Sequence, residues 1–155
     1  MSEPLVVRYA KTDDDIIHIH QFLCIVAGLT LPGPIGPKES IEEIWRLTHE
    51  DVALMAMNGD ALVGTLGLTC PAFWWNHKIR FLVNRFFFTL PGSKAARPLL
   101  KEAKAIAKAS NVELHILDEN RKRYLIFNKN PHRNNHLAAD ATAGRVKPRV
   151  SEIAL

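Results

Sequence analysis

The stretch that decides the fold is Ile79–Ala109, which reads IRFLVNRFFFTLPGSKAARPLLKEAKAIAKA. Its first part, Ile79–Leu90, is rich in aromatic and β-branched residues and predicts a long strand. Pro91 and Gly92 break that strand. Apolar residues then recur at helical spacing, which predicts a helix that runs to about Ala109. The buried stripe of this helix consists of Ala96, Leu99, Leu100, Ala103, Ile106 and Ala107.

The turn between this strand and this helix has the features of an anion site. The start of a helix exposes unpaired N–H groups and the positive end of its dipole. Small residues within Gly92–Ala96 allow a ligand to approach the backbone, and Lys94 and Arg97 add positive charge. The segment therefore predicts a site for phosphate or pyrophosphate, although an ordinary strand–helix connection has the same pattern.

Pro98 leaves two positions open for the start of the helix. If Ser93 caps the helix, Pro98 lies in its fifth position and removes the hydrogen bond to the Lys94 carbonyl. If the helix begins near Arg97, Pro98 is its first residue and the anion site is weaker.

Upstream of this stretch, the pattern predicts a strand, two helices and a hairpin. Leu5–Tyr9 is a Val-rich first strand. Thr12 and Asp15 form a capping box for a helix that ends near Gly28, and Ser40 and Glu43 form a second box for a shorter helix. The turn former Asn58-Gly59 then joins the strands Asp51–Met57 and Ala61–Leu68.

Downstream, the pattern becomes weaker. Asn111 is expected to end the helix in a left-handed conformation, before a strand over Val112–Leu117. We expect a last helix over Asn120–Lys129, with Tyr124 and Phe127 facing inward, and an edge strand within Val146–Ile153. The order of elements predicts an α/β or α+β domain with a mixed sheet and helices on both faces.

Composition fits one globular domain of 155 residues, with 47% hydrophobic residues. Two cysteines exclude a disulfide framework and favour a cytoplasmic protein, and we find no membrane span. Residues 1–60 hold 4 Lys/Arg against 10 Asp/Glu, whereas residues 61–155 hold 16 against 6. The basic half indicates an anionic partner, which is a phosphorylated cofactor, nucleic acid or an acidic surface.

The order of these segments resembles the GNAT superfamily of acyl-CoA-dependent N-acyltransferases. The resemblance covers roughly residues 5–130 and rests on four places. These are Val7–Ala10 before the acidic helix start, the hairpin Asn58–Gly64, the turn Ser93–Ala96, and Asn120 with an aromatic seven residues on, Phe127. At the third place only Ala96 fits the general pyrophosphate signature; Ser93–Ala96 is similar to a variant found in phage and bacteria.

The resemblance implies a mostly antiparallel central sheet with helices on both faces, in a domain over residues 1–130 followed by a basic tail over 131–155. It implies acetyl-CoA or another acyl-CoA as co-substrate, no metal, and direct attack by an amine of a small molecule or a protein. The cofactor-binding residues that it implies are Phe86, Phe88, Gly92, Ser93, Lys94, Ala95, Ala96 and Asn120.

The proton donor and acceptor are less directly implied. The family's usual tyrosine position is Phe127 here, so Tyr124 is the candidate acid. The strand Phe81–Leu90 has no Asp or Glu, so a base would be His77, His115 or a water, or would not be needed. Trp74 and Trp75 would line an acceptor pocket or simply pack in a loop.

Two other functions stay open. Phe127 and the missing strand carboxylate fit a GNAT-fold binding or assembly module without catalysis. The basic tail fits a nucleic-acid-binding protein, although few aromatics are interleaved with its charges, and we do not expect that partner. A tail that cannot complete the sheet alone leaves a homodimer open.

Overall fold

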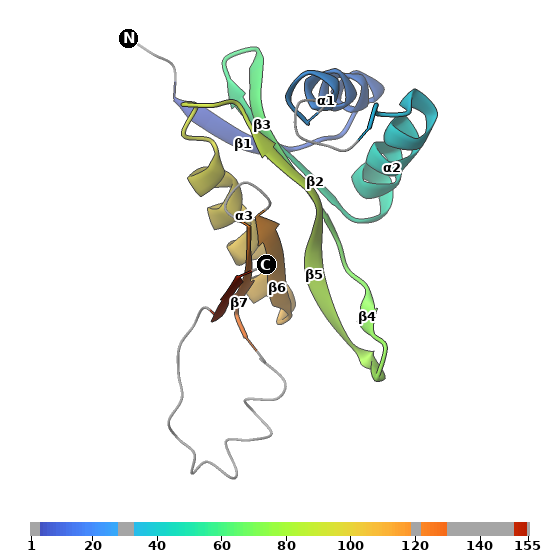
Figure 1. Cartoon of the computed structure of the whole chain (residues 1–155), viewed down its shortest axis with the longest axis vertical. Coiled ribbons are helices and arrows are strands. Elements are labelled where there is room, and N and C mark those ends of the chain that lie inside the picture. Colours follow the sequence, from blue (N-terminus) through green and yellow to red (C-terminus); the bar gives the residue numbers. More distant parts are fainter. Residues whose placement is uncertain (1–3, 28–32, 119–121, 130–150, 155) are drawn as a thin grey trace. The chain divides into compact units, whose positions relative to one another are not determined.

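A computed structural model describes residues 4–27, 33–118, 122–129 and 151–154 (Figure 1). The chain divides into two compact units, and each is described by itself. The first unit contains Met1–Thr69 and Arg85–Glu102, and the second contains Cys70–Asn84 and Ala103–Leu155. Strand β5 (Asn76–Thr89) and helix α3 (Ala96–Ser110) each contribute residues to both units.

The sheet of the first unit follows the hydrogen-bonded order β1-β2-β3-β5. The bounds are Leu5–Tyr9 for β1, Val52–Asn58 for β2 and Ala61–Thr69 for β3. The predicted hairpin is confirmed: β2 and β3 pair antiparallel, and Gly59 at their turn has φ 64°. A positive φ is accessible to glycine without steric cost, which explains the Asn-Gly pair.

Helix α1 (Asp13–Val26) begins as the sequence predicts. Thr12 Oγ1 accepts the Asp15 amide at 3.1 Å, and the Asp15 carboxylate accepts the Thr12 amide at 3.3 Å. The same carboxylate binds both guanidinium nitrogens of Arg8, at 2.8 and 3.0 Å. The hydrogen bonds from Arg8 hold the pKa of Asp15 well below its usual range.

The predicted start of helix α2 (Pro37–Glu50) is wrong. The helix begins three residues before Ser40, with Gly36 as the capping residue and Pro37 in its first turn. Proline suits that position because its missing N–H would have no helical partner there. Ser40 therefore lies inside the helix, where its hydroxyl contacts His20 Nδ1 at 2.9 Å.

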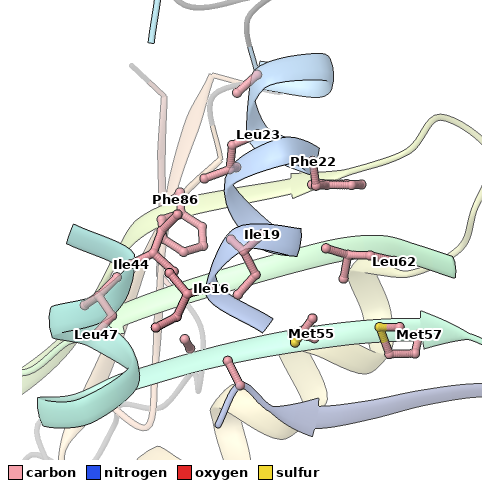
Figure 2. Packing of buried hydrophobic residues seen from close by; sticks show 13 residues of the cluster. Ile16, Ile19, Phe22, Leu23, Ile44, Leu47, Met55, Met57, Leu62 and Phe86 are labelled. Carbon is pink, nitrogen blue, oxygen red and sulfur yellow. The ribbon is translucent and has the colours of Figure 1, made fainter. Parts of the chain in front are cut away.

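The main core of the first unit lies between α1, α2 and one face of the sheet (Figure 2). Ile19 and Leu47 are fully buried, and the alternate β2 residues Met55 and Met57 point toward the helices. Phe86 from β5 fills the space between the helices and the sheet. The apolar faces of both helices thus pack into one continuous core.

Two glycines in β3 bring helices close to opposite faces of this sheet. A Cβ at Gly67 would lie 2.5 Å from the Phe86 ring and 2.8 Å from Leu47 of α2. A Cβ at Gly64 would lie 2.9 Å from the Ala95 Cβ and 3.1 Å from Leu99 of α3. Positions three apart in a strand face opposite ways, so helices cover both faces, as predicted.

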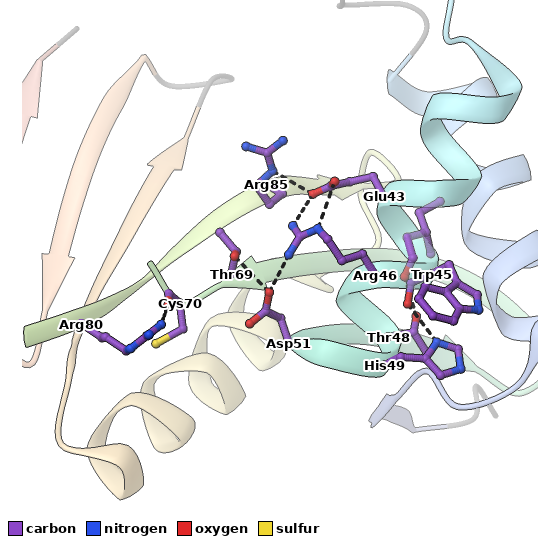
Figure 3. A network of polar contacts seen from close by, with 11 residues as sticks. Glu43, Trp45, Arg46, Thr48, His49, Asp51, Thr69, Cys70, Arg80 and Arg85 are labelled. Atoms are coloured by element: carbon purple, nitrogen blue, oxygen red, sulfur yellow. Dashed lines mark hydrogen bonds and ion pairs between the residues drawn. The ribbon is translucent and has the colours of Figure 1, made fainter. Parts of the chain in front are cut away.

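Ion pairs join α2 to β5 and to Asp51, and a hydrogen bond joins Asp51 to β3 (Figure 3). Arg46 binds Glu43 at 2.6 Å and Asp51 at 2.8 Å. Thr69 donates its hydroxyl to Asp51 at 3.0 Å, and Arg85 donates to Glu43 at 2.9 Å. These side chains are half-exposed, so each pair contributes little alone.

The second unit contains a sheet in the order β5-β6-β7-β8, with β4 (Ala72–Phe73) paired to β5. β5 and β6 (Glu113–Asp118) run parallel. β7 (Arg123–Phe127) and β8 (Ser151–Ala154) add antiparallel pairs. Asn111 ends α3 with φ 56°, which confirms the predicted left-handed terminator. The sheet is thus mixed and mostly antiparallel, as expected.

The last helix predicted from the sequence is wrong in the residues that the structure describes. Arg123–Phe127 is a strand, and its first residue pairs with Asp118 at the end of β6. The connection between these strands is therefore only four residues long. Lys122 and Asn128, which flank the strand, both have φ 52°. Asn120 lies outside the described residues.

Candidate functional site

The predicted anion site begins with a tight turn that ends β5. The Ser93 amide donates to the Leu90 carbonyl at 3.1 Å, and Gly92 has φ 77°. Pro91 followed by a residue with positive φ fits a type II turn. An added Cβ at Gly92 would meet no atom within 4 Å, so the space around this backbone is open.

Helix α3 begins between the two positions that the sequence left open. Its first residue is Ala96, and the Leu99 amide donates to the Ala95 carbonyl at 3.2 Å. Pro98 thus lies within the first turn, where no helical hydrogen bond is lost. The amides of Ala96 and Arg97 precede the helical series and point out of the helix start.

Not all amides of the turn face outward. The Ser93 amide closes the turn, and the Ala95 amide donates to Ser93 Oγ at 3.3 Å. Ala95 itself is buried against Gly64. Lys94, between them, is exposed and has φ 60°, a conformation that costs a non-glycine residue about 1 kcal/mol. Such strained residues concentrate at functional sites.

The two phenylalanines predicted to bind the cofactor have their side chains in the core. Phe86 is 9% exposed and belongs to the cluster with Gly67 and Leu47, and Phe88 packs against that cluster. Their rings are thus used for packing. What this part of β5 can offer a ligand is its backbone.

Beyond Val83, the contact between β5 and β6 is made by the Asn84 side chain. The printed ladder runs from Phe81 with Glu113 to Val83 with His115. At the next position Asn84 Oδ1 accepts the Leu117 amide at 2.7 Å, and Asn84 Nδ2 donates to the Leu117 carbonyl at 3.1 Å. The Asn84 side chain of β5 thus makes the hydrogen bonds to β6 that a backbone would otherwise make. The two backbones are therefore separated by the length of that side chain here.

Three polar side chains of β6 and β7 form a chain of contacts. Glu113 and His115 alternate along one face of β6. His115 Nε2 lies 2.8 Å from Glu113 Oε1, and His115 Nδ1 is hydrogen-bonded to the Tyr124 hydroxyl. Glu113 and His115 are each 8% exposed. Burial raises the pKa of Tyr124, and the charge of Glu113 adds to the rise.

Aromatic rings from the β4–β5 hairpin pack against this imidazole. The Phe81 ring lies 4.7 Å from the His115 ring and 4.4 Å from the Phe73 ring. Phe73 also stacks on Trp75 at 4.5 Å. Trp74 is 83% exposed and meets Trp75 edge-on. The tryptophans thus extend an aromatic row from the imidazole to the solvent.

The structure groups the predicted residues differently from the sequence. Tyr124 lies on strand β7 rather than on a helix. It contacts His115 of β6, which is one of the candidate bases predicted from the sequence. Phe127 faces the other side of β7, under the Lys104 ammonium at 4.4 Å. His77 is exposed. Sequence reasoning missed Asn84 and Glu113, although the spacing Glu113-x-His115 on a predicted strand places both on one face.

Within the described ranges, no group of three or more His, Cys, Asp or Glu residues is arranged to hold a metal ion. None of the described helices is both long and apolar enough to cross a membrane.

Comparisons with known proteins identify the fold. No family model and no curated protein sequence matches the chain. A ribosomal-protein-alanine N-acetyltransferase from Brucella melitensis biovar Abortus 2308 superposes with a TM-score of 0.60 at 14% identity, over 99% of this chain and 100% of that one. A GNAT family acetyltransferase from Brucella melitensis in complex with acetyl-CoA gives 0.60 at 14% identity, over 75% and 77%.

A GNAT family acetyltransferase from Staphylococcus aureus gives a TM-score of 0.56 at 17% identity, over 76% of this chain and 87% of that one. The chain therefore has the GNAT fold, as its sequence predicted.

Proposed function

We propose that the chain is an N-acyltransferase that transfers an acetyl or similar acyl group from acyl-CoA to a primary amine. The observation that carries this proposal is the turn Leu90–Arg97, which follows a strand of a GNAT fold, leads into the start of helix α3 and has open space around Gly92. The acceptor would be an amine of a small molecule or a protein, and we expect the reaction to take place in the cytoplasm.

The pyrophosphate would bind at this turn. The outward amides of Ala96 and Arg97 and the positive end of the α3 dipole favour an anion there. The exposed side chains of Lys94 and Arg97 add two positive charges. Gly92 would permit close approach to the backbone, whereas Ser93 would act by holding the turn and Ala95 by anchoring it to β3.

The pantetheine arm would pair with the backbone of β5 at Phe86–Phe88, as an added strand. The rings of Phe86 and Phe88 would hold that backbone rigid from the core. Direct attack of the amine on the thioester then needs positioning, removal of a proton from nitrogen and delivery of a proton to sulfur. Tyr124 is the proposed donor to the leaving thiolate.

One observation favours a second candidate, a GNAT-fold module that binds CoA without catalysis. Strand β7 (Arg123–Phe127) lies where the resemblance implied a helix that carries the proton donor. Such a module would bind the cofactor and release no thiol.

The two candidates separate in one pair of measurements. Isothermal titration with acetyl-CoA should give a saturable heat that Gly92→Val abolishes, since valine is strained at φ 77°. Gly33→Val serves as the matched control, because an added Cβ there meets no atom within 4 Å. Release of free CoA thiol is then followed across a panel of primary amines. Binding with turnover supports the enzyme; binding without turnover on any amine supports the module; no binding contradicts both.

A further inference from the structure

The turn of the β4–β5 hairpin in the second unit consists of two tryptophans (Figure 1). Phe73 of β4 pairs with Asn76 of β5, so Trp74 and Trp75 are the two residues that join the strands. Turns of this length favour Gly, Asn and Asp, which accept a positive φ. Neither tryptophan has a positive φ. The geometry of the turn therefore does not explain why both positions are tryptophan.

Both indole rings of this turn are exposed to solvent. Trp74 is 83% exposed and Trp75 is 57% exposed. The other exposed large apolar side chains among the described residues all belong to the first unit. Two neighbouring indoles thus form an isolated apolar patch on the second unit, and exposed patches of this kind mark interaction sites.

The rings behind the turn hold it in place. Trp75 stacks on Phe73 at 4.5 Å, and Phe73 stacks on Phe81 at 4.4 Å. Phe81 packs in turn against the buried His115 at 4.7 Å. The position of the turn is therefore set by the interior of the second unit. Because a partner does not have to order these rings, the entropic cost of binding is small.

The charge next to the turn is positive. The segment Cys70–Asn84 contains Lys78 and Arg80 and no Asp or Glu. Both basic side chains are exposed, and neither forms an ion pair with an acidic residue in the part of the chain that the structure describes. Arg80 Nη1 donates to the Cys70 carbonyl at 2.9 Å, which orients the guanidinium. Residues two apart in a strand share a face, so the two charges lie together and favour an anionic partner.

Two anionic partners use aromatic and basic side chains together: single-stranded nucleic acid and a bilayer that contains anionic lipids. Nucleic acid needs ring faces on which successive bases stack. The rings of Trp74 and Trp75 are perpendicular, at 90°, and Phe73 covers one face of Trp75. A bilayer interface requires no stacking, since an indole places its apolar ring and its N–H at the level of the headgroups. The ring geometry therefore favours a bilayer.

The spacing of the charges from the turn agrees with the dimensions of a bilayer interface. Lys78 follows Trp75 by three residues, which is about 10 Å along an extended strand. Apolar side chains of peripheral proteins enter about 5–10 Å into the boundary between headgroups and acyl chains. With the indoles at this depth, Lys78 lies near the phosphates. Arg80 is about 7 Å further out, within about one Debye length of the charged surface.

We propose that this turn is a membrane-contact site, at which Trp74 and Trp75 enter the interface of a bilayer with anionic phospholipids and Lys78 and Arg80 bind its phosphate groups. The contact is peripheral and reversible, because only two indoles enter the interface. It is an interaction beyond acyl transfer and does not depend on the function proposed above.

Co-sedimentation of the full chain with vesicles tests the proposal. The vesicles consist of phosphatidylcholine alone or of phosphatidylcholine with phosphatidylglycerol. We expect the partition coefficient to be about 10-fold higher with the anionic lipid and to fall in high salt. Lys78→Glu should remove this preference, whereas Lys38→Glu, at an exposed position of α2, should keep it. Equal partitioning of the wild type into both kinds of vesicle, or no partitioning into either, would overturn the proposal.

The role of the indoles is tested on the anionic vesicles. Trp74→Ser should lower the partition coefficient about 10-fold, because it removes an interfacial ring. Ile25→Ser is the matched control, since Ile25 is a 69% exposed apolar residue of the first unit. Circular dichroism checks that both variants fold. A folded Trp74→Ser variant that partitions like the wild type would contradict the assignment of the turn.

A second measurement keeps both indoles of the turn. The chain has three tryptophans, so in the Trp45→Phe variant only Trp74 and Trp75 emit. Their fluorescence should shift to shorter wavelength on binding to anionic vesicles, and lipids with brominated acyl chains should quench it. Binding without a shift or quenching would mean that another surface contacts the bilayer, and the proposal would be wrong even if Trp74→Ser fails to fold.

Other occupants of the turn give distinct results. Binding of a fluorescent oligouridylate that Trp74→Ser abolishes, without binding to vesicles, would assign the turn to single-stranded nucleic acid. A dimer in sedimentation velocity that Trp74→Ser dissociates, again without binding to vesicles, would assign it to a second copy of the chain. Either result would overturn the membrane contact.

Discussion

The two units of the chain bury different chemistry. In the first, the core between α1, α2 and the sheet consists of aliphatic side chains together with methionines and with phenylalanines such as Phe22 and Phe86 (Figure 2). Gly67 lies against Phe86 and Leu47 of this core. In the second, one sheet face buries Glu113 and His115 under aromatic rings. We therefore expect the stability of the first unit to be most sensitive to added side-chain volume, and that of the second unit to lost hydrogen bonds. Substitutions in each unit test this difference.

The largest effect is expected from added volume in the first unit. Gly67→Ala places a Cβ 2.5 Å from the Phe86 ring and 2.8 Å from Leu47. Because both neighbours are buried, overpacking should lower the free energy of unfolding by about 1–3 kcal/mol. Urea unfolding monitored by circular dichroism measures this loss. Gly33→Ala is the control, and equal stability of Gly67→Ala and the wild type would contradict this sensitivity to volume.

In the second unit a change without added volume should be nearly as costly. Asn84→Ala leaves the Leu117 amide and carbonyl without their side-chain partner, which should cost about 1–2 kcal/mol. Asn84→Asp keeps the acceptor for the Leu117 amide but loses the donor to the Leu117 carbonyl. We therefore expect Asn84→Asp to be destabilised as well. A urea midpoint of Asn84→Ala equal to that of the wild type would show that these hydrogen bonds do not contribute to the stability of the second unit.

A pH effect should come from the first unit through Asp15. Its pKa is lowered in the folded chain by Arg8, so its contribution is fully present above the unfolded carboxyl pKa and is lost as pH falls through the folded one. Stability should therefore fall from about pH 5 toward pH 2. Asp15→Asn should remove about 1 kcal/mol at neutral pH, after allowing for the exposed Arg8, and should flatten this acid slope. Urea midpoints at a series of pH values measure both, and an unchanged slope would contradict the assignment.

The smallest effect is expected at the half-exposed ion pairs. Arg85→Gln removes the bond to Glu43, which keeps its pairing with Arg46 (Figure 3). The expected loss is about 0.5 kcal/mol or less, and it should shrink in high salt. Differential scanning calorimetry at low and high salt measures it. A loss as large as that of Gly67→Ala would mean that the first unit depends on charge as well as volume.

The same comparison explains what the sequence could predict. The strands and the hairpin of the first unit followed from periodicity, the Asn-Gly turn and the Thr12 capping box. The start of α2 did not, because Pro37 in the first helical turn competes with the capping-box pattern at Ser40. Local signals are reliable where one element buries one apolar face.

In the second unit the prediction of a last helix was wrong. Arg123–Phe127 is a short run of strand-forming residues that packs alternate side chains, with Leu125 and Phe127 buried. The resemblance favoured a helix there, and the pairing with β6 that decides the outcome is not local. Tyr124 and His115 were both named from the sequence, but their contact follows only from the pairing of β6 with β7.

The most direct test of the account is a titration of the 15N-labelled chain with acetyl-CoA, followed by backbone amide NMR. We predict saturable shifts that are largest at the amides of Lys94, Ala96 and Arg97 and along Phe86–Phe88, with smaller ones elsewhere. Saturation without shifts at this turn, or no saturable shifts at all, would contradict the claim that the end of β5 and the start of α3 bind the diphosphate of an acyl-CoA.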